Sequence, residues 1–202
     1  MKTRTLAIMA AIFASATLSR ADITGTTLTY VDNDVMYCSV SSVTNLGVQN
    51  GVNAFQVGVD GDHEVFGTGT IWGDIITDSE ADPSLNLLHS IDNDTGFTWT
   101  DYHLKITLNK TFSLSNVTVD NGWSSVITGP TLVGSDWIGY IDYYAGTPII
   151  NGGTLDFGYT MTFTGGVSFS EDLTPTSVPE PGTFALMACG LAGLLVMRRR
   201  SA

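Results

Sequence analysis

The stretch LDFGYTMTF at residues 155–163 alternates between apolar positions and polar or small ones. Its apolar side chains all share one parity: Leu155, Phe157, Tyr159, Met161 and Phe163. Successive side chains of a β-strand point to opposite faces, so this pattern predicts a strand with one face in a core and the other in water. Half-buried strands of this kind are typical of antiparallel sheets.

Similar alternation occurs on both sides of this stretch. Residues 104–108 read LKITL, and Val167 and Phe169 form a short final run. Residues 22–180 contain 23 Thr, which favours strands, and 19 Gly, which interrupts them. We therefore expect residues 22–172 to form one all-β domain, an antiparallel β-sandwich of nine to eleven strands with jelly-roll-like order.

Short polar and glycine-containing segments divide these strands. We expect turns at Asp60-Gly61, Asn121-Gly122, Gly129-Pro130 and Asn151-Gly152, because Gly and Asn tolerate positive φ and Pro presets the first turn position. Residues 78–86 (DSEADPSLN) are predicted to form an irregular loop or a single helical turn.

The charge distribution argues against nucleic acid as a partner. The chain has 20 Asp and Glu against 8 Lys and Arg, a formal net charge of −12. Residues 22–180 retain all 20 acids but only Lys105 and Lys110, so this part carries a net charge of −18. Binding to phosphates requires clustered basic residues. The chain has only 2 cysteines, which excludes a disulfide framework.

Residues 1–21 have the organisation of a secretory signal peptide. Lys2 and Arg4 precede an uncharged apolar run from Leu6 to Leu18, and small residues stand at Ser19 and Ala21 before the predicted cut. The alternative is an N-terminal membrane anchor. The run of 13 residues is short for that role, because a membrane-spanning helix needs about 20.

The C-terminus has three successive parts. Residues 173–181 form a linker rich in Pro and Thr, and residues 182–197 carry no charge. As a single transmembrane helix this segment would span about 24 Å. The basic tail at residues 198–202 would stop transfer and stay cytoplasmic through Arg198, Arg199 and Arg200. A buried core helix is a poor alternative, because a core helix rarely ends in three arginines.

The tail resembles the PEP-CTERM sorting signal. The resemblance rests on Val178, Pro179, Glu180 and Pro181, on the apolar segment that follows them, and on the arginines at 198–200. It implies a Gram-negative bacterium that makes exopolysaccharide. It also implies processing near the Pro-Glu-Pro segment by exosortase, a transpeptidase-like membrane enzyme, and delivery to the cell surface or surrounding matrix. The resemblance covers residues 178–202 and leaves the body unassigned.

Acidic residues alternate in the segment DGDHE, where Asp60, Asp62 and Glu64 are candidates for a weak Ca²⁺ site. Carboxylates are suitable ligands for Ca²⁺, which takes six to eight oxygens. However, no EF-hand loop is present, and solvated turns explain the same residues because Asp and Asn cap local backbone groups. Calcium is the only cofactor that the sequence suggests.

Aromatic residues offer a second kind of site. Exposed Trp and Tyr rings can stack on sugars, but aromatic side chains also fill cores. Tyr143 and Tyr144 differ in parity, so we expect one of the two rings to be exposed. The candidates for a glycan-binding face are Trp72, Trp99, Trp123, Trp137, Tyr143 and Tyr144.

No catalytic group of residues is evident. His63, His89 and His103 lack the paired spacing of a zinc site. We therefore predict a non-catalytic structural or glycan-binding protein of the cell surface, extracellular matrix or biofilm, with polysaccharide as its partner. One alternative is a secreted carbohydrate-active enzyme with two carboxylates about 5–10 Å apart. Another is a passive domain that is only exported and anchored.

Overall fold

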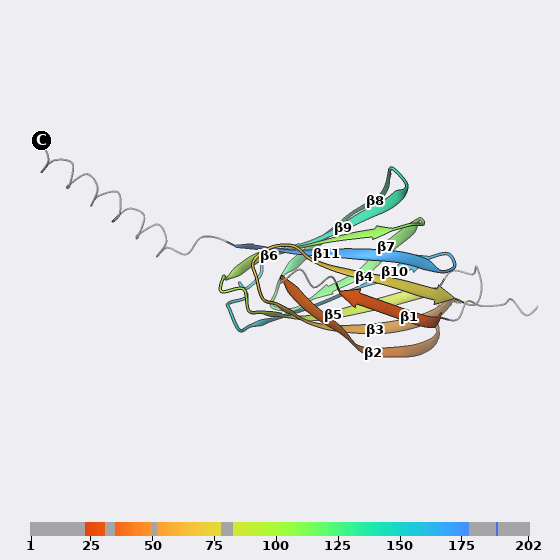
Figure 1. The fold of residues 1–202 in the computed structure, drawn as a ribbon, viewed down its shortest axis with the longest axis horizontal. Coiled ribbons are helices and arrows are strands. Elements are labelled where there is room, and N and C mark those ends of the chain that lie inside the picture. Colours follow the sequence, from red (N-terminus) through yellow and green to blue (C-terminus); the bar gives the residue numbers. More distant parts are fainter. Residues whose placement is uncertain (1–22, 31–34, 50–51, 78–82, 178–188, 190–202) are drawn as a thin grey trace, which may run out of the picture.

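The structure, a computed structural model, describes residues 23–30, 35–49, 52–77, 83–177 and 189. Within these residues the chain forms eleven strands in two sheets (Figure 1), which confirms the expected all-β fold. The strands are β1 (Ile23–Tyr30), β2 (Met36–Gln49), β3 (Val52–His63), β4 (Gly69–Thr77), β5 (Ser84–Asn93), β6 (Trp99–Leu108), β7 (Phe112–Val119), β8 (Ser124–Val133), β9 (Asp136–Tyr144), β10 (Thr154–Phe163) and β11 (Val167–Ser177).

The six-stranded sheet has the order β1-β4-β11-β6-β9-β8, and the five-stranded sheet has the order β2-β3-β5-β10-β7. From β3 to β7 each consecutive strand crosses to the other sheet. This crossing explains one departure from the antiparallel expectation. Strands β3 and β5 pair in parallel, because β4 runs back through the opposite sheet before β5 begins. The other ladders within the described residues are antiparallel.

The core lies between the two sheets, and the alternation seen in the sequence sets its contents. Every apolar residue of the 155–163 stretch is buried, which confirms its predicted parity. Burying one such side chain stabilises a fold by about 1.5–3 kcal/mol. Strand β6 supplies the facing layer with Trp99, Tyr102, Leu104, Ile106 and Leu108, none of which is more than 1% exposed.

Two dipeptides that we expected to form turns lie inside strands. Gly61 belongs to β3, where an added Cβ would lie only 2.7 Å from the sulfur of Cys38 on β2. Glycine therefore allows a close approach of two strands here, and the chain does not reverse. Gly129-Pro130 lies within β8 at a β-bulge, so it bends the strand and does not end it.

Two other expected turns are confirmed. Asn121-Gly122 connects β7 to β8, with φ values of +58° and +70°. Asn151-Gly152 forms the turn before β10, with φ of +80° at the glycine. Residues 84–86 of the expected irregular loop differ from prediction, because β5 already begins at Ser84, whereas Pro83 lies outside the strand as expected. Residues 78–82 lie outside the described part.

The predicted linker begins later than residue 173. Strand β11 continues to Ser177, so residues 173–177 belong to the six-stranded sheet. Pairing of β11 with β4 ends at Leu173, and the following residues pair only with β6. Pro175 has no N–H group to donate. It lies where β11 pairs with β6 alone, so the missing donor interrupts no hydrogen bonds to β4.

The sorting segments fall outside the described residues. These are the predicted signal peptide at 1–21, the motif at 178–181, the basic tail at 198–202, and the apolar segment at 182–197 apart from Cys189. Within the described part of the chain, no helix has the length and apolar composition that crossing a membrane requires.

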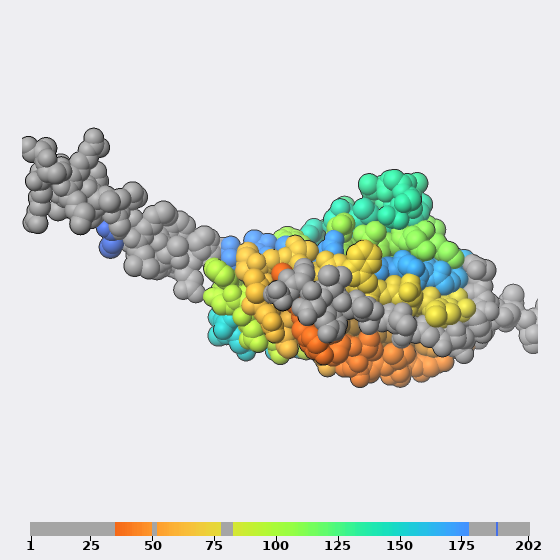
Figure 2. Space-filling view, in the orientation of Figure 1, coloured from red at the N-terminus to blue at the C-terminus, as the bar shows by residue number. Residues whose placement is uncertain are grey.

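The β8–β9 hairpin projects from the body at one edge of the six-stranded sheet (Figures 1 and 2). Apolar side chains on β8 remain exposed there, with Leu132 at 58% and Val133 at 57%.

Candidate functional site

A groove of about 360 Å³ crosses the outer face of the five-stranded sheet. Residues from all five of its strands, and one residue that follows β7, line the groove. The residues that line it are Ser41, Ser42, Gly58, Asp60, Leu88, His89, Ser90, Thr118, Val119, Asp120, Asp156 and Phe157.

Two glycines keep the floor of the groove low. Gly58 on β3 and Gly158 on β10 flank Leu88 of β5 in one cross-strand row. A Cβ at Gly58 would lie 2.6 Å from the Ser42 hydroxyl, and one at Gly158 would lie 2.6 Å from Leu88 Cδ2. Leu88 is 41% exposed between them. The middle of the floor is therefore an accessible apolar side chain.

The next row along the sheet is polar. Asp60, Ser90 and Asp156 stand side by side on β3, β5 and β10. The Ser90 hydroxyl donates a hydrogen bond of 2.6 Å to Asp156 Oδ1. Asp120 lies next to Asp156, since its backbone N–H donates to the Asp156 carbonyl at 3.0 Å. The groove thus combines hydroxyl and carboxylate groups with a small apolar floor.

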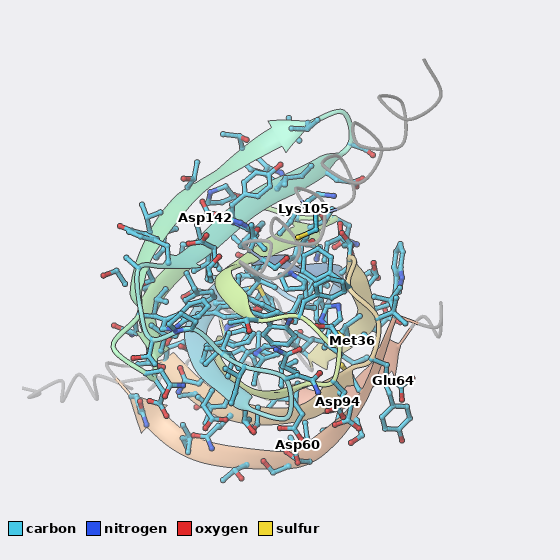
Figure 3. The ribbon with its side chains drawn as sticks, turned by 90° about the vertical axis from the view of Figure 1, so that its left-hand side faces the viewer. Met36, Asp60, Glu64, Asp94, Lys105 and Asp142 are labelled. Atoms are coloured by element: carbon cyan, nitrogen blue, oxygen red, sulfur yellow. The ribbon has the colours of Figure 1, made fainter. Side chains whose placement is uncertain are left out.

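The acidic character continues beyond the groove. Asp62 lies one row further along β3, opposite Asp92 of β5. Burial raises the pKa of the Asp62 carboxyl, and the nearby charges of Asp92 and Asp94 raise it further. Figure 3 shows Asp60, Asp94 and Glu64 on one side of the molecule and Lys105 with Asp142 on the other.

We expect replacement of Asp62 by asparagine to stabilise the protein at neutral pH. The folded state binds a proton at Asp62 more readily than the unfolded state does, so its charged form opposes folding above the ordinary pKa of 3.8. Thermal unfolding at pH 7 should show a melting temperature about 1 °C higher for Asp62→Asn, given the usual size of exposed charge effects. The increase in melting temperature should disappear below pH 3.8, where the Asp62 carboxyl is neutral in both the folded and the unfolded state.

Asp136→Asn is the matched control, because it changes the net charge equally on the other sheet. An equal stabilisation by Asp136→Asn would show that total charge, and not the neighbours of Asp62, causes the effect.

The calcium candidates do not converge. Asp60 and Asp62 share the outer face of β3, but Glu64 follows the end of the strand, where its backbone N–H donates to the Val35 carbonyl at 2.9 Å. Within the described residues, no group of three or more His, Cys, Asp or Glu side chains is arranged to hold a metal ion.

The structure corrects three of the six aromatic candidates. Trp99 and Tyr143 are 0% exposed and Trp123 is 6% exposed, so their rings belong to the core. Parity explains only Tyr143, which shares the inward side of β9 with Ile141; Trp99 lies at a register irregularity between β6 and β11, and Trp123 precedes β8. Tyr144 is 40% exposed beside buried Tyr143, as their opposite parity predicts.

The remaining aromatic residues do not form one patch. Trp72, on β4, is 53% exposed, whereas Trp137 on β9 is only partly buried at the edge of the core. Tyr140, also on β9, is 40% exposed. Strands β11 and β6 separate β4 from β9, so the backbones of these two strands lie about 14 Å apart at the usual strand spacing.

Hydrogen-bonded polar pairs fill the surface between them. The Lys105 ammonium donates to Asp172 Oδ2 at 2.9 Å, and Thr70 donates to the other oxygen of the same carboxylate at 2.9 Å. The hydrogen bond to Asp172 raises the pKa of Lys105. Beside this pair, His103 Nδ1 lies 2.8 Å from an oxygen of Asp142.

Sequence reasoning missed a buried polar network between the sheets. Glu171, on β11 of the six-stranded sheet, is 1% exposed and accepts a hydrogen bond from the Tyr159 hydroxyl on β10. Its other oxygen lies 2.9 Å from His89 Nε2 on β5. Burial, followed by the charge of Glu171, raises the pKa of Tyr159 well above its ordinary value.

The signal for this network was present in the period-2 pattern. Glu171 shares its parity with Val167, Phe169 and Leu173, all of which face the core. An acidic residue at an inward position predicts a buried partner, because an unpaired buried charge is strongly unfavourable.

The three histidines lie in separate places. His63 is buried, with Nε2 bonded to the Gly67 carbonyl at 2.9 Å, and burial lowers its pKa to about 4. His89 belongs to the buried network, and His103 lies on the outer face of the six-stranded sheet. Cys38 is also buried; burial first, then Glu171 and Asp62, raise the pKa of its thiol to about 12. A thiol held protonated in this way is a poor nucleophile.

Comparison with known proteins identifies the tail alone. Residues 177–200 match the family described as the PEP-CTERM protein-sorting motif, which confirms the resemblance predicted from the sequence. No curated protein and no solved structure matches the chain. The molecule is thus an exported β-sandwich protein. More particularly, it carries a PEP-CTERM tail, which implies membrane-associated sorting in a Gram-negative bacterium and processing by exosortase.

Proposed function

We propose that the body of this exported protein is a non-catalytic, jelly-roll-like domain that holds a polysaccharide chain in the groove of the five-stranded sheet. The observation that carries the proposal is the groove itself. It crosses the whole width of the sheet, from edge strand β2 to edge strand β7, and its volume of about 360 Å³ lies within the range of small-molecule sites.

The chemistry of the lining suits a sugar. Sugars present many hydroxyl groups around a ring with apolar faces, so they need hydrogen-bonding groups beside a small apolar surface. The hydroxyls of Ser41, Ser42 and Thr118 and the carboxylates of Asp60 and Asp156 supply the first. Leu88 supplies the second at the centre of the floor.

The proposed sorting route would bring this groove to a compartment that contains polysaccharide. In this proposal residues 1–21 are a signal peptide, and residues 182–197 hold the protein in the inner membrane until exosortase acts near Pro179–Pro181. The protein then reaches the cell surface, matrix or biofilm, where exopolysaccharide surrounds it. The net charge of −18 in residues 22–180 keeps the domain soluble there.

One observation favours the enzyme alternative as a second candidate. Asp60 and Asp156 line the same groove with only β5 between their strands, so their backbones lie about 10 Å apart at the usual strand spacing. Inverting glycosidases place their two carboxyl groups about 6.5–9.5 Å apart. Release of reducing sugar ends from a bound polysaccharide would favour the enzyme, and binding without release favours the non-catalytic role.

Filling the groove should abolish binding. Ser41 lines it from the exposed strand β2, so Ser41→Trp places a large ring in the groove without changing the core. Isothermal titration calorimetry against exopolysaccharide of the host should show at least tenfold weaker binding for Ser41→Trp.

Thr44→Trp is the matched control, because Thr44 is exposed on the same strand but does not line the groove. We expect Thr44→Trp to bind like the unchanged protein. Undiminished binding by Ser41→Trp, or no binding by the unchanged protein, would contradict the proposal.

A further inference from the structure

The negative charge around the groove indicates which class of polysaccharide it would bind. Asp60 on β3 and Asp156 on β10 stand in the cross-strand row next to Leu88, and Asp120 lies beside Asp156. All three are exposed. A chain that crosses the sheet in the groove therefore passes along this row of negative charges, and salt at physiological strength screens such short-range interactions only in part.

No basic side chain among the described residues compensates these charges. The Lys105 ammonium lies on the opposite outer face and is bonded to Asp172. Lys110 follows β6, and its ammonium donates to the Thr164 carbonyl at 3.3 Å. The imidazole of His89, whose backbone lies beside the groove, is 0% exposed and faces the core.

The negative charge continues along the outer face of the five-stranded sheet. Asp62 and Asp92 stand opposite each other one row beyond Asp60, and burial, followed by the charges of Asp92 and Asp94, raises the pKa of the Asp62 carboxyl. A ligand with carboxylate or sulfate groups would meet repulsion along the whole path. A ligand with ammonium groups would be attracted along it.

We propose that the groove selects a polysaccharide carrying free amino groups, such as a partly de-N-acetylated hexosamine chain, over neutral chains, and excludes acidic polysaccharides. This inference rests on the proposed function, since it names the class of chain that the groove holds. The carboxylates set the preference for amino sugars. Leu88 and the Ser and Thr hydroxyl groups of the groove can contact any sugar, so they set the affinity that all chains share.

Three oligosaccharides of equal length test the inference by calorimetry: a glucosamine hexamer, an N-acetylglucosamine hexamer and a hexamer of uronic acid. We expect the glucosamine hexamer to bind about tenfold more tightly than the neutral one, as two or three exposed charge pairs would provide. The uronic acid hexamer should not bind. The preference for amino groups should fall as sodium chloride rises from about 0.05 M to 0.5 M.

A triple variant tests whether the groove carboxylates cause the preference for amino groups. Asp60→Asn/Asp120→Asn/Asp156→Asn should bind glucosamine and N-acetylglucosamine hexamers with nearly equal affinity. The control triple variant removes the same number of charges from the six-stranded sheet and should keep the preference; it is Asp74→Asn/Asp101→Asn/Asp136→Asn.

The outcomes separate this inference from the proposed function. Equal binding of amino and neutral hexamers by the unchanged protein, or an equal loss of preference in both triple variants, would overturn the inference and leave a neutral polysaccharide site intact. Tight binding of the uronic acid hexamer would also overturn it. Failure of every hexamer and of the host polysaccharide would contradict the proposed function.

Discussion

Glu171→Ala should lower the free energy of unfolding by about 3–5 kcal/mol, because it removes the partner of two buried polar groups and leaves a cavity. Glu171 connects the two sheets, since it belongs to β11 while its partners His89 and Tyr159 belong to the five-stranded sheet. Alanine would leave the Tyr159 hydroxyl and His89 Nε2 buried without partners and would open a cavity between them. The loss is a large fraction of the 5–15 kcal/mol that stabilises a typical domain.

Urea unfolding followed by tryptophan fluorescence would measure this change. Glu171→Gln should lose less, because its amide can still accept from Tyr159 and donate to His89. This second variant stays informative if Glu171→Ala does not fold. Asp172→Ala is the matched control, since Asp172 is the next residue but faces solvent and pairs with Lys105 at the surface. Similar losses in Glu171→Ala and Asp172→Ala would show that the buried network does not hold the sheets together.

Trp99→Ala should also destabilise the domain by about 3–5 kcal/mol, the usual effect of removing a buried Trp. Trp99 is 0% exposed at the start of β6, and its indole N–H donates to Thr95 Oγ1 at 3.1 Å. Its ring packs against Tyr102 and edge-on against His63, with centroids 5.2 and 5.6 Å away. Alanine would remove these contacts and leave a cavity in the most tightly buried part of the core.

Trp72→Ala provides a matched comparison within the same protein. Trp72 is 53% exposed on the outer face of β4, so its loss should change stability by no more than about 0.5 kcal/mol. Thermal unfolding by circular dichroism should therefore show a fall of about 10 °C for Trp99→Ala and almost none for Trp72→Ala. Equal shifts would contradict the assignment of Trp99 to the core and Trp72 to the surface.

Effects on stability and effects on sugar binding can be measured separately, because the two sets of variants lie in different parts of the domain. The buried network and Trp99 lie between the sheets, whereas the groove lies on the outer face of the five-stranded sheet. A change at Ser41 or at the groove carboxylates can therefore be read as an effect on binding. Trp72 is exposed on the opposite face, so an effect of Trp72→Ala on sugar binding can also be separated from stability. This variant tests whether aromatic rings on that face contribute to sugar binding.

Local patterns predicted the strands better than the turns. Alternation identified the inward face of 155–163 correctly, because the period of two is a property of the extended backbone itself. Asp60-Gly61 and Gly129-Pro130 misled because glycine has two uses. It permits positive φ in a turn, and it also permits close approach of two strands, as Gly61 does against Cys38. A single sequence does not distinguish these uses.

The candidate site was predicted only in part. Asp60 was identified as an acidic candidate, and it does line the groove, but together with Asp120 and Asp156, which are 60 and 96 residues away along the chain. Aromatic residues were preferred as sugar contacts, yet Trp99, Trp123 and Tyr143 are buried. Trp99 is buried although its parity differs from that of Tyr102 and Leu104, so neither composition nor alternation alone predicts its burial.

Some properties of this protein can be read from the order of residues because their causes are local. The sorting tail acts through a contiguous segment, and strand faces follow from alternation between neighbours. The groove and the Glu171 network have a different origin. Each joins strands distant in the chain, and their positions depend on which strands become neighbours and in what register. Burial of the core as a whole decides that pairing, so only the folded structure shows these sites.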